Sequence, residues 1–201
     1  AVKSKAREAG AELFSMDDEI LYGPEFHRLG FGKAVSEQLL TDYKVLVLAV
    51  DERIVGPKFQ QQFANEDKEL NLEDIARIIG CWNGLSKKFI GEEAEVEDTL
   101  PMKRAVAFAS TIPYSKAIAN VFQNVVTEYN SKNNSKGSLN CELRHVDGTF
   151  NVLLRNQRLD WLKAEPPENT CRILTNARCL SEGVDVPALD AVLFLNPRKS
   201  M

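Results

Sequence analysis

The chain has 201 residues, of which 44% are hydrophobic and 27% charged, and its formal net charge is -4 at pH 7. This length and composition predict a soluble globular protein with one sizeable core. The acidic balance argues against nucleic-acid binding over the whole surface, because such binding depends on Lys and Arg; it leaves room for a local groove. No run approaches the ~18 consecutive apolar residues of a membrane span, and the first residues lack the apolar core of a signal peptide. We therefore expect a cytoplasmic protein with no membrane partner.

The cysteines indicate neither a disulfide framework nor a metal site. Cys81, Cys141, Cys171 and Cys179 form no C-x-x-C pair and have no histidine at metal-ligand spacing. We expect buried free thiols in a reducing compartment and no bound metal.

The first third of the chain gives mixed signals. We predict a helix over residues 1–12, a hairpin-like element around the Gly-Pro pair in residues 19–29, and helical spacing over residues 31–40. Residues 43–50, YKVLVLAV, form a continuous apolar run of the kind found in the centre of a parallel sheet. Residues 51–69 are polar and ambiguous.

Strands and helices alternate over the rest of the chain. This alternation predicts right-handed βαβ units and a mostly parallel sheet with helices on both faces. The predicted strands are residues 104–110, 143–146, 171–175 and 191–196. The predicted helices are residues 71–88, 113–129 and 149–163, and Thr149 is the predicted N-cap of the last. The predicted loops include the acidic residues 91–101 and the polar residues 131–138.

Polar residues follow three of the predicted strands. Ser110 and Thr111 follow the first, Gly148 and Thr149 the second, and Asn176 the third. Ligands of open parallel sheets bind beyond the carboxyl ends of the strands, so these residues would line one binding edge. Each residue taken singly is also explained as a cap of the next helix.

The turn after residue 175 is unusually rich in functional residue types. Gly183 permits a left-handed turn or close approach of the backbone to a ligand, and Asp185 could accept hydrogen bonds from a ribose. Other nucleotide and hydrolase motifs are missing. GFGK, residues 30–33, lacks the spacing and the Ser or Thr of a phosphate loop, and His27 and His145 lie too far apart in sequence to suggest a dyad.

Three segments in this order, RAVAFASTIPYSKAIANVF, LRHVDGT and ILTNARCLSEGVDVPALDAVLFLNP, resemble motif IV, the following strand-end motif and motif V of superfamily 2 helicases and translocases. The run HRLGFGKAVSEQLLTDYKVLVL resembles the lead-in to the second lobe in restriction enzymes and DNA-defence helicases. The resemblance implies a RecA-like three-layer α/β fold over residues 19–201, truncated before motif VI, with residues 1–18 as a linker from a missing first lobe.

The resemblance also implies site residues. Glu182, Gly183 and Asp185 of motif V would bind the nucleotide. Contacts to the nucleic-acid backbone, which position a strand without reading bases, would come from Ser110, Thr111, Gly148, Thr149, Asn176 and Arg178. RNA-helicase relatives have Thr-Asp where this chain has Ala177 and Arg178, which favours a duplex-DNA motor.

In that family the first lobe holds most of ATP and Mg²⁺, and motif VI supplies an arginine to the transferred phosphate. The segment is therefore predicted to be inactive alone, because loss of such an arginine costs ~10³ or more in rate. Our leading hypothesis is the C-terminal motor lobe of an ATP-dependent DNA helicase or translocase from a restriction or phage-defence protein, with DNA and the first lobe as partners. A non-catalytic RecA-like protein-interaction module and an excision-repair-type helicase lobe are the alternatives.

Overall fold

The computed structural model describes residues 18–45, 70–87, 100–132, 139–177, 179–180 and 189–196. The chain divides into two compact units, Ala1–Val45 and Leu46–Met201. The helix predicted over residues 1–12 lies outside the described residues. The predicted division between a linker and a lobe at residue 18 stays a prediction.

The first unit contains two short helices, α2 (Glu19–Tyr22) and α3 (Phe31–Ser36). The Asp18 carboxylate caps α2 by accepting a 3.0 Å hydrogen bond from the amide of Ile20. The hairpin predicted over residues 19–29 is wrong, because this cap satisfies helix amides locally and no described residue of the unit offers a strand partner.

Two other predictions in this unit need correction. Helix α3 stops short of residue 40, because Gln38 has a φ of 60° and a left-handed residue does not continue a right-handed helix. In the strand predicted over residues 43–50, residues 43–45 are exposed and form no strand. Residues 46–50 lie outside the described part of the chain.

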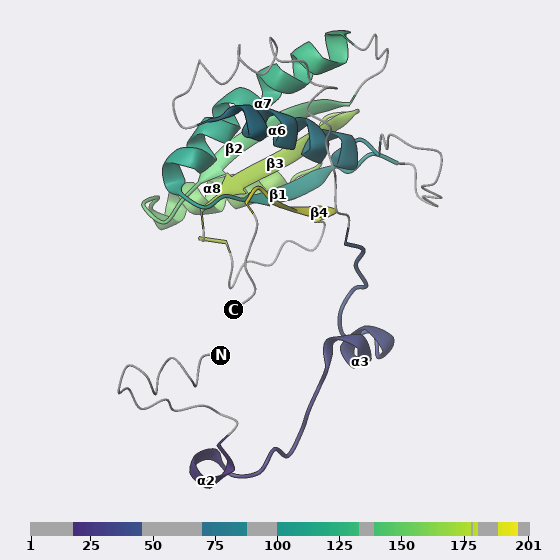
Figure 1. The fold of residues 1–201 in the computed structure, drawn as a ribbon, viewed down its shortest axis with the longest axis vertical. Coiled ribbons are helices and arrows are strands. Elements are labelled where there is room, and N and C mark those ends of the chain that lie inside the picture. The colour runs from purple at the N-terminus through teal and green to yellow at the C-terminus, as the bar shows by residue number, and fades with distance from the viewer. Residues whose placement is uncertain are drawn as a thin grey trace. The chain divides into compact units, whose positions relative to one another are not determined.

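The second unit contains a four-stranded, entirely parallel sheet (Figure 1). Its strands stand in the order β2-β3-β1-β4, so β2 is an edge strand of the described sheet and β3 lies in its interior. Each strand matches a predicted one to within a few residues. Their bounds are β1 (Arg104–Phe108), β2 (Asn140–Val146), β3 (Thr170–Asn176) and β4 (Ala191–Phe194).

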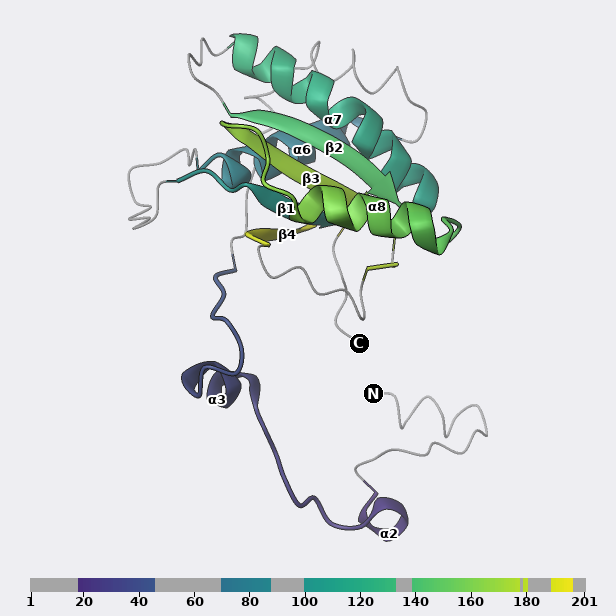
Figure 2. The ribbon, with the colours of Figure 1, turned by 180° about the vertical axis from the view of Figure 1, so that it is seen from behind.

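Helices cover both faces of this sheet. Helices α6 (Leu72–Leu85) and α7 (Ile112–Lys132) lie on one face, and α8 (Val152–Lys163) lies on the other, as Figures 1 and 2 show from opposite sides. The chain moves toward the β2 edge of the sheet between β1 and β2, and away from that edge between β2 and β3. Because both connections are right-handed crossovers, their helices α7 and α8 must lie on opposite faces. The predicted three-layer α/β fold is confirmed.

The two faces bury cores of different size. The larger core lies under α6 and α7, where Trp82 and Phe122 are almost completely buried and their rings meet edge to face at 6.5 Å. It also encloses Cys141 and Cys171, and burial raises the pKa of each thiol to about 12. The smaller core lies under α8 and contains Val106, Val146, Leu162, Leu174 and Leu180.

Helix α6 follows its prediction closely. Asn71 caps it by accepting a 3.0 Å hydrogen bond from the amide of Asp74, and the Asp74 carboxylate accepts a 2.9 Å bond from the amide of Asn71 in return. This reciprocal capping box begins the helix. Among the described residues, no helix has both the length and the apolar composition needed to cross a membrane.

Candidate nucleic-acid interface at the strand ends

The carboxyl ends of all four strands meet at one edge of the sheet. Phe108, the last residue of β1, is in register with Asn176 at the end of β3 and with Phe194 at the end of β4, and Val146 of β2 is in register with Asn176. The residues that follow β1 and β2 therefore share one edge, as the sequence predicts. We call this edge the rim and define it by residues 109–111, 147–149, 176 and 196.

The segment after β1 is tied to the neighbouring strand ends. The amide of Ala109 donates to the carbonyl of Asn176 at 2.8 Å, and the amide of Ser110 donates to Oδ1 of Asn196 at 3.1 Å. Thr111 acts as a helix cap, because its Oγ1 accepts a 3.2 Å hydrogen bond from the amide of Tyr114 in the first turn of α7. Ser110 and Thr111 are both exposed, so both are accessible at the rim.

Asn176 is fully buried rather than presented to solvent. Its Nδ2 donates a 3.2 Å hydrogen bond to the carbonyl of Ala107, which joins the ends of β3 and β1. Its Oδ1 is buried and has no hydrogen-bond partner, which is unusual for a native polar group. In this conformation Asn176 holds the rim together, and its contact with nucleic acid stays a prediction.

A buried carboxylate organises the turn after β2. Asp147 is fully buried, and its Oδ1 accepts hydrogen bonds from the amide and from the hydroxyl of Thr149, the first at 2.8 Å. The Lys116 ammonium, on the first turns of α7, lies 3.4 Å from Oδ2 of Asp147. Burial alone would raise the pKa of Asp147, but the hydrogen bonds from Thr149 and His145 outweigh it and hold the pKa well below its usual range.

The same carboxylate belongs to a network of hydrogen-bonded side chains that the sequence analysis did not predict. His145 Nε2 lies 2.8 Å from Oδ2 of Asp147, and His145 Nδ1 lies 2.8 Å from Oγ of Ser115 in α7. With Asp147 ionised, Nε2 donates to the carboxylate and Nδ1 accepts from Ser115. The sequence contained a signal for the contact between His145 and Asp147, because residues two apart on a strand point to the same face. Ser115 is fully buried, so this network is structural and presents no nucleophile to a substrate.

The predicted N-cap of α8 is wrong. The Thr149 side chain bonds Asp147, and the cap is Asn151, whose Oδ1 accepts a 2.8 Å hydrogen bond from the amide of Leu154. Gly148 and Thr149 are consequently free of the helix and form an exposed turn at the rim.

The predicted nucleotide residues Glu182, Gly183 and Asp185 lie outside the described residues, as does Arg178. Their roles stay predictions. Within the ranges that the structure describes, no three His, Cys, Asp or Glu side chains are placed to hold a metal ion.

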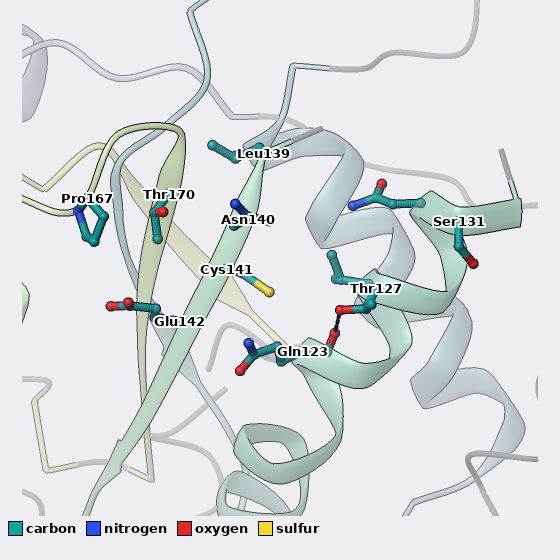
Figure 3. A pocket seen from close by; sticks show the side chains of 11 residues that line it. Gln123, Thr127, Ser131, Leu139, Asn140, Cys141, Glu142, Pro167 and Thr170 are labelled. Carbon is teal, nitrogen blue, oxygen red and sulfur yellow. Dashed lines mark hydrogen bonds between the residues drawn. The ribbon is translucent and has the colours of Figure 1, made fainter. Parts of the chain in front are cut away.

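A cavity of about 450 Å³ lies away from the rim (Figure 3). Its lining includes Asn140 and Thr170, the first residues of β2 and β3, and Ser131 near the end of α7. These residues mark the amino ends of the parallel strands. The cavity is therefore separate from the predicted binding edge.

Among solved structures, the chain is similar to an ATP-dependent Type ISP restriction-modification enzyme, LlaBIII, bound to DNA. The two are 44% identical over 94% of this chain, with a TM-score of 0.79. This chain is related to a segment of that restriction-modification enzyme. It spans 12% of the length of the relative. No protein-family model and no curated protein matches it. The relation confirms the resemblance to restriction-type helicases and agrees with the RecA-like fold.

Proposed function

We propose that this chain is the second motor lobe of an ATP-dependent DNA translocase or helicase of the restriction-modification type. The observation that carries the proposal is the 44% identity, over 94% of the chain, to an ATP-dependent restriction enzyme bound to DNA. The geometry of the rim supports it independently, since ligands of such sheets bind at the carboxyl ends of the strands.

In this proposal, the rim contacts the sugar-phosphate backbone of DNA. Ser110, Thr111 and Thr149 are exposed and carry hydroxyl groups, and Gly148 has open space around its Cα. The Lys116 side chain is half exposed beside them and supplies a positive charge. Hydroxyls, backbone amides and a lysine are typical groups for phosphate contacts, which position a strand without reading its sequence.

The nucleotide is held between this lobe and the first lobe of the motor. Glu182, Gly183 and Asp185 contact it from this side, while the first lobe supplies the phosphate loop and most of the Mg²⁺ ligands. ATP favours the closed arrangement of the lobes because it contacts both, and hydrolysis releases that preference. The chain alone is inactive as an ATPase, because its sequence contains no phosphate loop.

ATPase measurements with and without duplex DNA test this proposal. We expect no turnover from the chain alone, and DNA-stimulated turnover from a two-lobed protein that contains it. In that protein, Asp185→Ala should abolish the stimulation, whereas Asp160→Ala, on the exposed face of α8, should leave it unchanged. Turnover by the chain alone, or full stimulation in the Asp185→Ala variant, would contradict the proposal.

A further inference from the structure

Among the residues that the structure describes, five arginines lie on the side of the sheet covered by α8, and two of them have clear structural partners. Arg172 donates to the carbonyls of Trp161 and Ala164 at 2.8 and 3.2 Å and pairs with Glu142 at 3.1 Å. Arg104 lies 2.5 Å from Glu165 and 3.4 Å from the Ala164 carbonyl. These two cations donate to carbonyl groups at the carboxyl end of α8, where a positive charge is favourable.

The other three, Arg144, Arg155 and Arg158, have no such role. Within the described part of the chain, none of them makes an ion pair, and the Nε atoms of Arg155 and Arg158 are buried without a hydrogen-bond partner. All three side chains are half-buried. A partly buried cation is stabilised by an anion, and the described residues supply none to this group.

Like charges are concentrated here. The Arg144 guanidinium lies over the ring of Trp161, 4.6 Å from the centroid, and Arg172 lies 5.2 Å from the same ring. The pKa of Arg144 is lowered by burial and then by the nearby charges of Arg158 and Arg172. Among the described acidic residues, Glu142 offsets them, and it is already paired with Arg172.

We propose that Arg144, Arg155 and Arg158 form a second binding surface for the phosphate backbone of DNA, on the α8 side of the sheet. We call it the arginine surface. The proposal rests on the proposed function, because it adds a contact to the same DNA.

The chemistry of these residues suits phosphate. A guanidinium stacked on an indole keeps its N–H edge free, and that edge matches two phosphate oxygens at once. Arg155 and Arg158 are three residues apart on α8 and so are neighbours on its surface. Duplex DNA presents one phosphate per ~1.7 Å of axis, so a row of guanidinium groups meets several phosphates.

The arginine surface begins near the rim, because Arg155 lies on the first turn of α8, which starts shortly after Thr149. Arg155 is close enough to Cys179 to influence the pKa of its thiol, and Asp147 acts on the same thiol. The Cys179 thiol itself donates to the carbonyl of Val146, the last residue of β2. Arg155 therefore lies near the strand ends, and Arg158 extends the row away from them along α8.

Salt-dependent binding of a short fluorescent DNA duplex tests the proposal. We expect Arg144→Gln, Arg155→Gln and Arg158→Gln together to weaken binding at least tenfold and to reduce the slope of log K against log salt by about 0.9 per lost phosphate contact. The control is Lys132→Gln, which removes an exposed charge at the last residue of α7, on the opposite face of the sheet, and should change neither quantity.

Arg→Lys at the same three positions separates charge from folding. We expect these variants to keep the salt slope of the original chain and to lose part of the affinity. A folded glutamine variant with unchanged affinity and slope would overturn the arginine surface, as would a lysine variant that loses as much slope as the glutamine variant.

The same assay distinguishes this failure from failure of the proposed function. If Ser110→Ala with Lys116→Gln weakens binding while the arginine variants do not, the motor-lobe proposal survives and the arginine surface is wrong. If the original chain binds no duplex even at low salt, DNA contact by this lobe is wrong and both proposals fall.

Discussion

His145 and Asp147 are joined by a 2.8 Å hydrogen bond between Nε2 and Oδ2 at the end of the edge strand β2. Ser115 of α7 bonds to His145, and Thr149 of the exposed turn at the rim bonds to Asp147, so the four side chains form one hydrogen-bonded network. A change at the buried end of this network therefore reaches the turn that is proposed to contact DNA.

Asp147→Asn should destabilise the chain by about 2–4 kcal/mol. The amide cannot accept from His145, Thr149 and Lys116 together, and a buried donor left without an acceptor is costly. Urea unfolding followed by circular dichroism measures the loss. Asp160→Asn on the exposed face of α8 is the control and should stay within ~0.5 kcal/mol of the original chain.

The same variant should change the response to acid. The folded-state pKa of Asp147 is depressed, so its contribution to stability is complete above the unfolded pKa of ~3.9 and is lost as the pH falls through the folded value. Between about pH 5 and about pH 3 the original chain should therefore lose more stability than Asp147→Asn. Parallel curves for the two proteins would mean that the Asp147 carboxylate is not held ionised by its partners.

Thr111→Val should cost about 1 kcal/mol, because it removes the hydroxyl that caps α7. Thr111→Ser restores an oxygen at the same place and should recover most of the stability. Thermal unfolding of the three proteins measures both effects. If the serine variant is as unstable as the valine variant, the cap is not the reason for the loss.

Gly148→Ala should fold with the stability of the original chain. A Cβ at Gly148 meets nothing within 4 Å, and Gly148 is not among the described glycines with positive φ. DNA binding by this variant then reports close approach of a phosphate to the turn. We expect a several-fold loss of affinity with an unchanged melting temperature; a large drop in melting temperature would show that the glycine is required by the fold.

Tyr114→Phe should destabilise the packing of α6 on α7 by about 1–2 kcal/mol. The Tyr114 hydroxyl donates a 2.7 Å hydrogen bond to the buried carboxylate of Asp74, and bonds to charged groups are among the stronger ones. Burial and this bond raise the pKa of Tyr114 above its usual value, so spectroscopic titration should find one tyrosine that ionises late. Tyr22→Phe, at an exposed position, should leave the stability and the late-ionising tyrosine unchanged.

The sequence was sufficient for the elements with strong local signals. Helix α6 has both its N-cap and its apolar face in the sequence, and the four strands are short apolar runs separated by polar segments. Alternation of strands and helices then determined a parallel sheet, because such connections are right-handed crossovers. The rim was predictable for the same reason, since parallel strands end at one edge.

Weak local signals predict the wrong structure in two places. Residues 19–29 contain β-prone runs around a Gly-Pro pair, yet the carboxylate of Asp18 caps a single helical turn there. The sequence predicts Thr149 as the cap of α8, and Asn151 caps the helix instead. In both places several polar side chains compete for the same backbone amides, and sequence alone does not rank them.

Only the tertiary structure decided which polar groups are buried and which partners they bond. Asn176 and Asp147 both stand at the carboxyl end of a strand, but the Asn176 side chain bonds the neighbouring strand and the Asp147 side chain anchors an exposed turn. The strand order β2-β3-β1-β4 brings Ser115, His145 and Asp147 together and places Arg144 over Trp161. The sequence by itself determined the elements and the edge at which their strands end, because both follow from local periodicity and chain direction. The partners of each charge depend on contacts between residues far apart in the chain, which only the packed sheet and helices define.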